Sequence, residues 1–124
     1  MSASPGQPSC ATHSRWVNIC GADDLVPFSG ISAFVAGEQA AIFYVPDAVP
    51  QVYALDNWCP CAEANVLSRG MVGDIGGELV VASPIYKEHY SLTTGACLEK
   101  PASVRVWPVC VQGDRVLLQL PEHK

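Results

Sequence analysis

Short apolar segments of strand length, separated by turn-forming residues, constrain the fold of this 124-residue chain more than any other feature. Apolar runs that alternate or are rich in β-branched and aromatic residues predict strands. They cover 31–36, 40–45, 52–55, 79–82, 104–111 and 116–120. Pro108 interrupts one run, so that strand lies at an edge or carries a bulge. Only 22–25 and 62–67 look helical, and both are too short to stand alone. The pattern predicts an all-β sandwich or barrel of antiparallel strands.

Length and composition narrow the class of protein. We expect one domain over 15–120, with flexible tails over 1–14 and 121–124. Seven Lys and Arg against twelve Asp and Glu give a formal net charge of -5 without a basic cluster, which excludes nucleic acid and anionic membranes as partners. The chain has no apolar run of membrane-spanning length and begins without a secretory signal. We therefore expect a cytoplasmic protein whose six cysteines are thiols or metal ligands.

Two segments carry distinctive chemistry. The first is Cys59-Pro60-Cys61, and the second is SPIY at 83–86, followed by YSLTTG at 90–95. Together they resemble the two cluster loops of a Rieske iron-sulfur domain, in which each loop supplies one Cys and one His to a two-iron cluster. The resemblance places the four ligand positions at Cys59, Cys61, Ser83 and Tyr86. Three of the four family ligands are thereby replaced, and Ser and Tyr oxygens are poor substitutes because they ionise only at high pH.

Longer blocks extend the resemblance over about 15–120. The blocks 66–70, 81–92 and 94–99, with the opening 16–20, resemble the small subunit of assimilatory NAD(P)H-dependent nitrite reductase. This resemblance implies a Rieske-like fold of two antiparallel sheets with no cluster, no metal and no catalytic residue of its own. It implies a non-catalytic accessory subunit. The partner would be a large subunit that binds FAD, siroheme and an iron-sulfur centre and reduces nitrite to ammonia in nitrate assimilation.

The same resemblance implies that the two loops, 57–70 and 83–92, form one tip of the molecule. We expect this tip to dock on the large subunit. The expected interface residues are Trp58, Arg69, Tyr86, Lys87 and His89. Tyr86 would also fill the volume that a cluster occupies in other members, because a void there would be costly. Arg69 is a candidate for contact with the partner, and a solvated turn arginine is the simpler interpretation.

Several alternatives stay open at the level of the sequence. Cys59 and Cys61 are ordinary buried or half-exposed thiols, a metal-binding pair or a redox-active disulfide. A Rieske-type electron-transfer ferredoxin with a 2Fe-2S cluster would need unusual ligands, drawn from Cys59, Cys61, His89 and Cys97. His89 needs no metal to explain it, since a surface or hydrogen-bonded imidazole suffices. A third class is a protein-interaction module unconnected with nitrogen metabolism. Three further residues are interpreted as packing groups, namely Cys20, Cys110 and Trp107.

Overall fold

The computed structural model describes residues 16–35, 37–48, 51–85 and 87–119, and regular structure there consists of strands and two short 3₁₀ turns. The predicted tails and Tyr86 lie outside the described residues. In the first half the strands are β1 (Trp16–Gly21), β2 (Ser29–Val35), β3 (Glu38–Tyr44), β4 (Val52–Asp56) and β5 (Trp58–Cys59). The remaining strands are β6 (Ala64–Asn65), β7 (Met71–Ile75), β8 (Glu78–Ala82), β9 (His89–Ser91), β10 (Val109–Gln112) and β11 (Arg115–Gln119). The 3₁₀ turns are η1 (Ala22–Asp24) and η2 (Leu67–Arg69).

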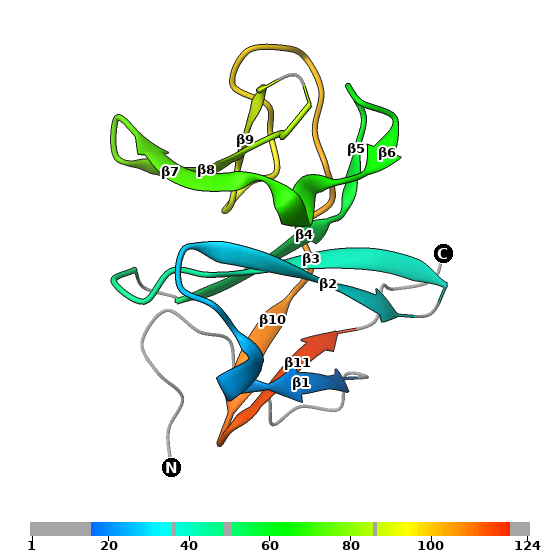
Figure 1. The fold of residues 1–124 in the computed structure, drawn as a ribbon, viewed down its shortest axis with the longest axis vertical. Helices are drawn as coiled ribbons and strands as arrows, with labels where there is room; N and C mark the ends of the chain where they lie inside the picture. The colour runs from blue at the N-terminus through cyan, green and yellow to red at the C-terminus, as the bar shows by residue number, and fades with distance from the viewer. Residues whose placement is uncertain (1–15, 36, 49–50, 86, 120–124) are drawn as a thin grey trace.

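The strands form three layers, one above another (Figure 1). The lower sheet has the order β1-β11-β10, the middle sheet β2-β3-β4 and the upper sheet β7-β8-β9, while β5 and β6 form a separate hairpin beside the upper sheet. Every pairing between these strands is antiparallel. The all-β, antiparallel prediction is therefore confirmed, although the described chain has three three-stranded sheets rather than the two sheets expected.

Alternation along the middle sheet divides the interior into two hydrophobic cores. In β3, Ala41 and Phe43 face the upper core, whereas Ala40 and Ile42 face the lower one. Successive side chains of a strand point to opposite faces of its sheet, so a strand that is covered on both faces must be apolar at every position. This explains the unbroken apolar run in the sequence.

Tertiary contacts changed the predicted elements in two places. The predicted strand 104–111 is shortened to β10, because Pro108 lacks an amide hydrogen and the segment before it makes only an isolated bridge, Val106 to Leu55. The segment 62–67, which looked helical, instead contains β6, and pairing with β5 satisfies its backbone. Among the described residues, no helix is long and apolar enough to cross a membrane.

The chain between the upper sheet and β10 is tied to the middle sheet by one polar cluster. Arg105 forms ion pairs with Glu38 and Asp56, and its guanidinium lies 4.6 Å from the centre of the Trp107 ring. The Trp107 indole donates a hydrogen bond of 2.8 Å to Asp56. Trp107 is 2% exposed and belongs to the lower core, as predicted. The cluster holds the returning chain against β4.

The two cysteines predicted as packing residues differ in their surroundings. Cys110 is 1% exposed and disulfide-bonded, so the expectation that all six cysteines are thiols or metal ligands is wrong for this residue. Cys20 is a half-buried free thiol that packs against the lower core. Burial, followed by the nearby Asp24 carboxylate, raises the pKa of Cys20. Cys20 is accordingly a weak nucleophile at neutral pH.

Candidate functional site: the tip of the upper half

The first tip loop contains a short hairpin formed by β5 and β6. Trp58 and Cys59 of β5 pair with Asn65 and Ala64 of β6, which leaves Trp58 47% exposed and Cys59 fully buried. The turn between them is closed by the Glu63 amide, which donates to the Cys59 carbonyl at 2.7 Å. The hairpin thus turns one thiol inward and one indole outward.

Asn57, which is 2% exposed, joins this loop to the middle sheet. Its side-chain amide donates to Gln39 Oε1 at 2.9 Å, and its Oδ1 accepts the amide hydrogen of Ser68 at 2.7 Å. The backbone carbonyl of Asn57 accepts from the Leu67 amide at 3.0 Å. A buried asparagine with its hydrogen bonds satisfied specifies one arrangement of the loop. Asn57 was not predicted as a site residue, because its partners are distant along the chain.

The second tip loop, between β8 and β9, is closed around Ser83. The Ser83 amide donates to the Glu88 carbonyl at 2.8 Å, and the Lys87 amide donates to the Ser83 carbonyl at 3.0 Å. The Ser83 hydroxyl accepts from the Ile85 amide at 3.4 Å. Lys87 has a φ of 67°, a left-handed conformation that is uncommon for a residue with a side chain. The loop therefore turns sharply and leaves Ile85 and Lys87 on the surface.

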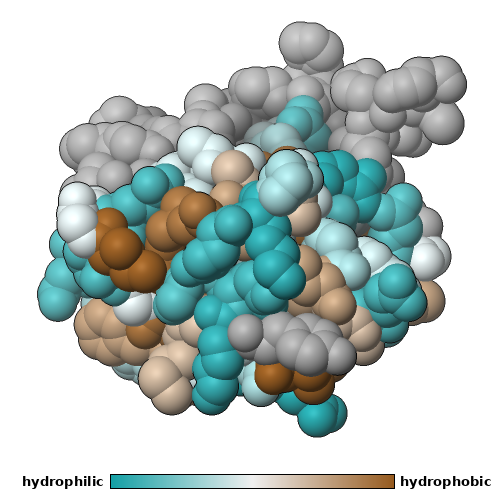
Figure 2. All heavy atoms as spheres, turned by 90° about the horizontal axis from the view of Figure 1, so that it is seen from above, coloured by the Kyte–Doolittle hydropathy of each residue, from teal (hydrophilic) through white to brown (hydrophobic). Residues whose placement is uncertain are grey.

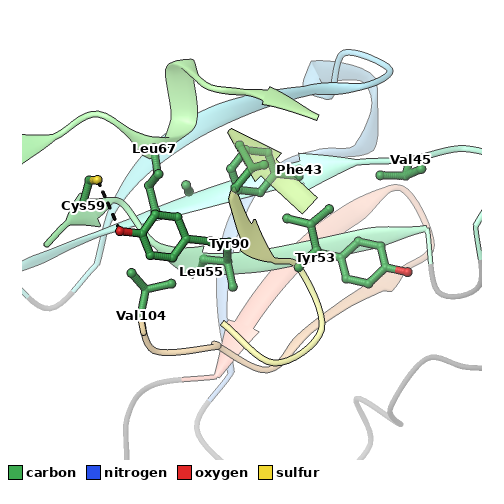
Figure 3. Packing of buried hydrophobic residues seen from close by; sticks show 11 residues of the cluster. Phe43, Val45, Tyr53, Leu55, Cys59, Leu67, Tyr90 and Val104 are labelled. Atoms are coloured by element: carbon green, nitrogen blue, oxygen red, sulfur yellow. Dashed lines mark hydrogen bonds between the residues drawn. The ribbon is translucent and has the colours of Figure 1, made fainter. Parts of the chain in front are cut away.

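The two loops meet below the surface at a group of sulphur and hydroxyl atoms. The Cys59 thiol lies 3.5 Å from Ser83 Oγ and 3.7 Å from the Tyr90 hydroxyl, which donates to Cys61 Sγ at 3.4 Å. Figure 3 shows the Tyr90 ring in the upper core with its oxygen directed at Cys59. The structure thus brings together three of the four predicted ligand positions, Cys59, Cys61 and Ser83.

Tyr90 is the central residue of this group and was not predicted as a site residue. It is fully buried. Burial raises the pKa of Tyr90, and the neighbouring Cys61 and Cys59 raise it further. The phenol therefore stays protonated and acts as a hydrogen-bond donor at neutral pH. In the sequence, Tyr90 is the aromatic residue that opens the segment YSLTTG. Only the fold places the Tyr90 hydroxyl beside two sulphurs.

A close backbone approach at Gly70 joins the two loops. Gly70 follows η2 and lies so close to the end of β8 that a Cβ atom there would be 2.2 Å from the Ala82 carbonyl oxygen and 2.7 Å from a Val81 methyl group. Only a residue without a side chain fits at this distance. The SRG block at 68–70 thus sets the spacing between the first loop and the strand that leads to Ser83.

Charged residues form pairs along the rim of the tip. His89 Nδ1 lies 2.6 Å from Glu99 Oε2, and the His89 amide donates to Glu99 Oε1 at 2.8 Å. That backbone hydrogen bond, followed by the imidazole, lowers the pKa of Glu99. The mostly buried Glu88 carboxylate accepts from Lys100 at 2.9 Å. His89 therefore faces a carboxylate.

The predicted interface residues do not all lie at the same height of the tip. Trp58 and Lys87 are exposed, and His89 is half-buried. Arg69 is exposed as well, but its turn η2 packs against β2 and β3, which places Arg69 at the base of the tip. Tyr86 lies outside the described residues, so its predicted role is not tested.

Exposed apolar side chains lie in the same part of the chain as the predicted interface residues. Ile85, in the second loop, is 52% exposed, and Leu98 is 41% exposed. The Leu98 amide donates a hydrogen bond to the His89 carbonyl, which ties Leu98 to β9. The view from above shows hydrophobic groups separated by hydrophilic ones on this end of the molecule (Figure 2). Such a mixture of apolar and charged groups is typical of protein interfaces.

The described residues contain no group of three or more His, Cys, Asp or Glu side chains placed to hold a metal ion. The alternative ligand set of Cys59, Cys61, His89 and Cys97 is not assembled there. His89 pairs with Glu99, and Cys97 Sγ lies 3.7 Å from Glu99 Oε1. The four residues therefore separate into the two thiols of Cys59 and Cys61 around Tyr90 and a rim cluster of His89 and Cys97 with Glu99.

Comparison with known proteins agrees with this architecture. The model of the Rieske-like [2Fe-2S] domain family matches residues 15–119. The crystal structure of an NADH-dependent nitrite reductase small subunit from Mycobacterium tuberculosis superposes with a TM-score of 0.82 and 36% identity, covering 90% of this chain and all of that one. The fold shown above is thus shared with small subunits of nitrite reductases.

Two curated relatives extend the comparison. The nitrite reductase (NADH) small subunit of Salmonella typhimurium is 48% identical over 86 residues, which are 69% of this chain and 79% of that protein. The NAD(P)H nitrite reductase large subunit of Klebsiella oxytoca is 44% identical over 115 residues, which are 92% of this chain but only 12% of that protein. The chain belongs to the Rieske-like domain family and, within it, to the family of nitrite reductase small subunits.

Proposed function

We propose that this chain is the accessory small subunit of an NAD(P)H-dependent nitrite reductase that reduces nitrite to ammonia in nitrate assimilation in the cytoplasm. The observation that carries the proposal is its similarity to small subunits of this enzyme, over 69% of the chain in a curated relative and 90% in a solved structure. A large subunit with FAD, siroheme and an iron-sulfur centre performs the reduction. The match within a Klebsiella large subunit supports this partner, because there a domain like this chain is part of the large polypeptide.

The chain itself acts without a cluster, a metal or a catalytic residue. A Rieske cluster needs two thiolates and two imidazoles. Around Tyr90 the described groups are two thiols, from Cys59 and Cys61, and the Ser83 hydroxyl, while His89 is engaged with Glu99. These groups do not fit the cluster of the family, so the chain contributes no redox centre. The Tyr90 side chain occupies the space between the loops and keeps the tip packed.

The tip is the surface that docks on the large subunit. Trp58 has the large, rigid, half-exposed ring that commonly dominates binding energy in an interface, and Ile85 adds exposed apolar area in the second loop. Arg69 and Lys87 are exposed cations that complement a partner carboxylate. The loops keep a defined shape through Asn57, Ser83 and Gly70 although their ligand chemistry is lost, and a rigid shape of this kind lowers the entropic cost of docking.

Affinity of the full chain for the purified large subunit tests this surface. Trp58→Ala and the charge reversal Lys87→Glu should each weaken binding by at least about tenfold, the loss expected when a central contact is removed. Arg69→Glu should have a smaller effect, because Arg69 lies at the base. Phe34→Ala is the matched apolar control, since Phe34 is 74% exposed on β2 outside the tip.

Arg115→Glu is the matched charge control, because Arg115 lies on β11 in the lower sheet. Equal losses in control and tip variants would show that the tip is the wrong surface. If no variant and no wild-type chain binds the large subunit, the proposed function itself is wrong.

A second candidate, a Rieske-type electron-transfer ferredoxin, is favoured by one observation. Cys59 Sγ and Ser83 Oγ, at the two positions that the family fills with cysteine, lie 3.5 Å apart. The visible spectrum and the iron content of anaerobically purified protein separate the two functions. Bands between about 400 and 600 nm with stoichiometric iron would favour the ferredoxin, whereas colourless, iron-free protein would favour the accessory subunit.

A further inference from the structure

The thiols of Cys59 and Cys61 are directed at the same buried hydroxyl group. Both sulphurs contact the same Tyr90 oxygen, at 3.7 and 3.4 Å. The residues are two apart across a turn, so their Cα atoms are at most about 7 Å apart. A disulfide requires a Cα separation of about 4.4–6.8 Å. The two ranges overlap, so a rotation within the turn that keeps the Cα atoms inside the disulfide range would let the two sulphurs meet.

The backbone of the turn permits this rotation. In the described chain, residues 60–62 make no backbone hydrogen bond, and Pro60 has no amide hydrogen to donate. The turn is held only at its ends, by the pairing of Cys59 with Ala64 and by the Glu63 amide on the Cys59 carbonyl. Cys61 can thus move toward Cys59 while the β5–β6 pairing stays intact.

The two thiols differ in their access to solvent. Cys59 is fully buried, whereas Cys61 is only partly buried. A reagent from solution therefore meets Cys61 first, and the buried Cys59 reacts faster with the modified Cys61 sulphur than with the reagent itself. This order of access matches that of an attacking thiol followed by a resolving thiol.

We propose that Cys61 and Cys59 form a reversible dithiol site that exchanges with low-molecular-mass disulfides of the glutathione type. The Cys61 thiolate attacks one sulphur of the external disulfide, forms a mixed disulfide and releases one external thiolate, which takes up a proton. The Cys59 thiolate then attacks the Cys61 sulphur, which forms the internal disulfide and releases the second external thiol. Two protein thiols are oxidised, and one external disulfide is reduced to two thiols.

The internal disulfide closes a small ring across Pro60. A ring this tight departs from the relaxed geometry of a disulfide, and strained disulfides are reduced readily. The site is therefore reversible: an excess of external thiol restores the dithiol. Oxidation also removes the thiol hydrogens beside Tyr90 and reshapes the turn next to Trp58. The inference does not depend on the proposed function, since the exchange needs only the chain itself.

The test uses the reduced full chain and oxidised glutathione. After incubation, remaining thiols are alkylated in acid-quenched samples, and the chain is cleaved after glutamate. Cleavage after Glu38 and Glu63 isolates fragment 39–63 with Cys59 and Cys61, and cleavage after Glu88 and Glu99 isolates Cys97. We expect fragment 39–63 to be two hydrogens lighter, with no alkyl group and no adduct. Added reduced glutathione should reverse the change.

Cysteine variants test the order of the two reactions, and Cys97 of the same chain serves as a control thiol. Cys59→Ser should leave a stable glutathione adduct on Cys61, and Cys61→Ser should slow modification of Cys59 at least about tenfold, because a buried thiol is inert. Among the described residues, the half-buried Cys97 thiol contacts the Glu99 carboxylate and not a second thiol. Because no resolving thiol contacts it there, Cys97 should keep any glutathione that it acquires. Cys97→Ser should leave fragment 39–63 unchanged.

Two results with the wild-type chain would overturn the inference, whatever the stability of the variants. One is a glutathione adduct that persists on fragment 39–63 without an internal disulfide. The other is a fragment 39–63 that stays fully reduced under conditions in which Cys97 has reacted.

Discussion

Substitution of Gly70 by alanine should destabilise the chain strongly, because the added methyl group has no room. The new Cβ would lie 2.2 Å from the Ala82 carbonyl oxygen and 2.7 Å from a Val81 methyl carbon. Backbone atoms must then move by about 1 Å to restore van der Waals contact, which begins at roughly 3.5 Å between carbon atoms. Overpacking of this kind costs about 1–3 kcal/mol, and we expect the upper part of that range because the obstacle is backbone.

Gly73→Ala provides the matched control in β7, the strand that begins directly after Gly70. A Cβ at Gly73 would meet no atom within 4 Å. Alanine in a strand interior is favoured over glycine by roughly 0.5–1 kcal/mol, so this variant should be neutral or slightly more stable. Urea unfolding followed by circular dichroism measures both free energies. In thermal unfolding, a loss of 1 kcal/mol corresponds to roughly 3–6 °C for a chain of this size.

A free energy of unfolding for Gly70→Ala within about 0.5 kcal/mol of the wild-type value, the range typical of neutral surface substitutions, would contradict this prediction. The close approach of η2 to β8 would then be without energetic weight. Equal destabilisation by both alanine variants would also contradict it, since the cost would then reflect loss of glycine as such and not the missing space.

Three further predictions concern the tip and its supports. Tyr90→Phe should lower the free energy of unfolding by about 1 kcal/mol, the usual net value of a hydrogen bond, and unchanged stability in urea would count against the bonds to Cys59 and Cys61. Arg105→Ala should cost about 1–2 kcal/mol through loss of its contacts with Glu38, Asp56 and Trp107, as measured by the same method, with Arg115→Ala as the exposed control. The lowered pKa of Glu99 means that its ionised form stabilises the fold above its ordinary value of 4.5, and this contribution is lost as the pH falls below that value. Glu99→Gln should therefore flatten the acid side of the stability profile, and a profile identical to wild type would contradict the His89 pairing.

Strands β3 and β4 of the middle sheet were predictable because both of their faces are buried. In 40–45 and 52–55 nearly every residue is apolar, and that composition alone favours a buried strand. By contrast, β7 has the sequence MVGDI, and most of its side chains are exposed. Its pairing with β8 comes from a tight turn at two glycines with positive φ, Gly76 and Gly77. Weakly apolar strands of this kind depend on their neighbours for their structure.

The sequence predicted the two loops of the candidate site but not the buried residues that connect them. The resemblance of the two loops located Cys59, Cys61 and Ser83, which the structure brings together. It passed over Tyr90 and Asn57, because a tyrosine and an asparagine are common residues whose role depends on what lies opposite them. The pairing of His89 with Glu99 was likewise invisible, since ten residues and a turn separate them along the chain.

The sequence by itself determined the class of fold, because the period of apolar residues decides which backbone can bury them. It also determined the family, because the loop motifs are contiguous in the chain. Only the tertiary structure decided that two sulphurs share the hydroxyl of one buried tyrosine and that Gly70 must lie against the end of β8. The physical reason is that hydrogen bonds and steric contacts depend on distances in space. Those distances are set by the packing of three sheets, which no local pattern of residues records.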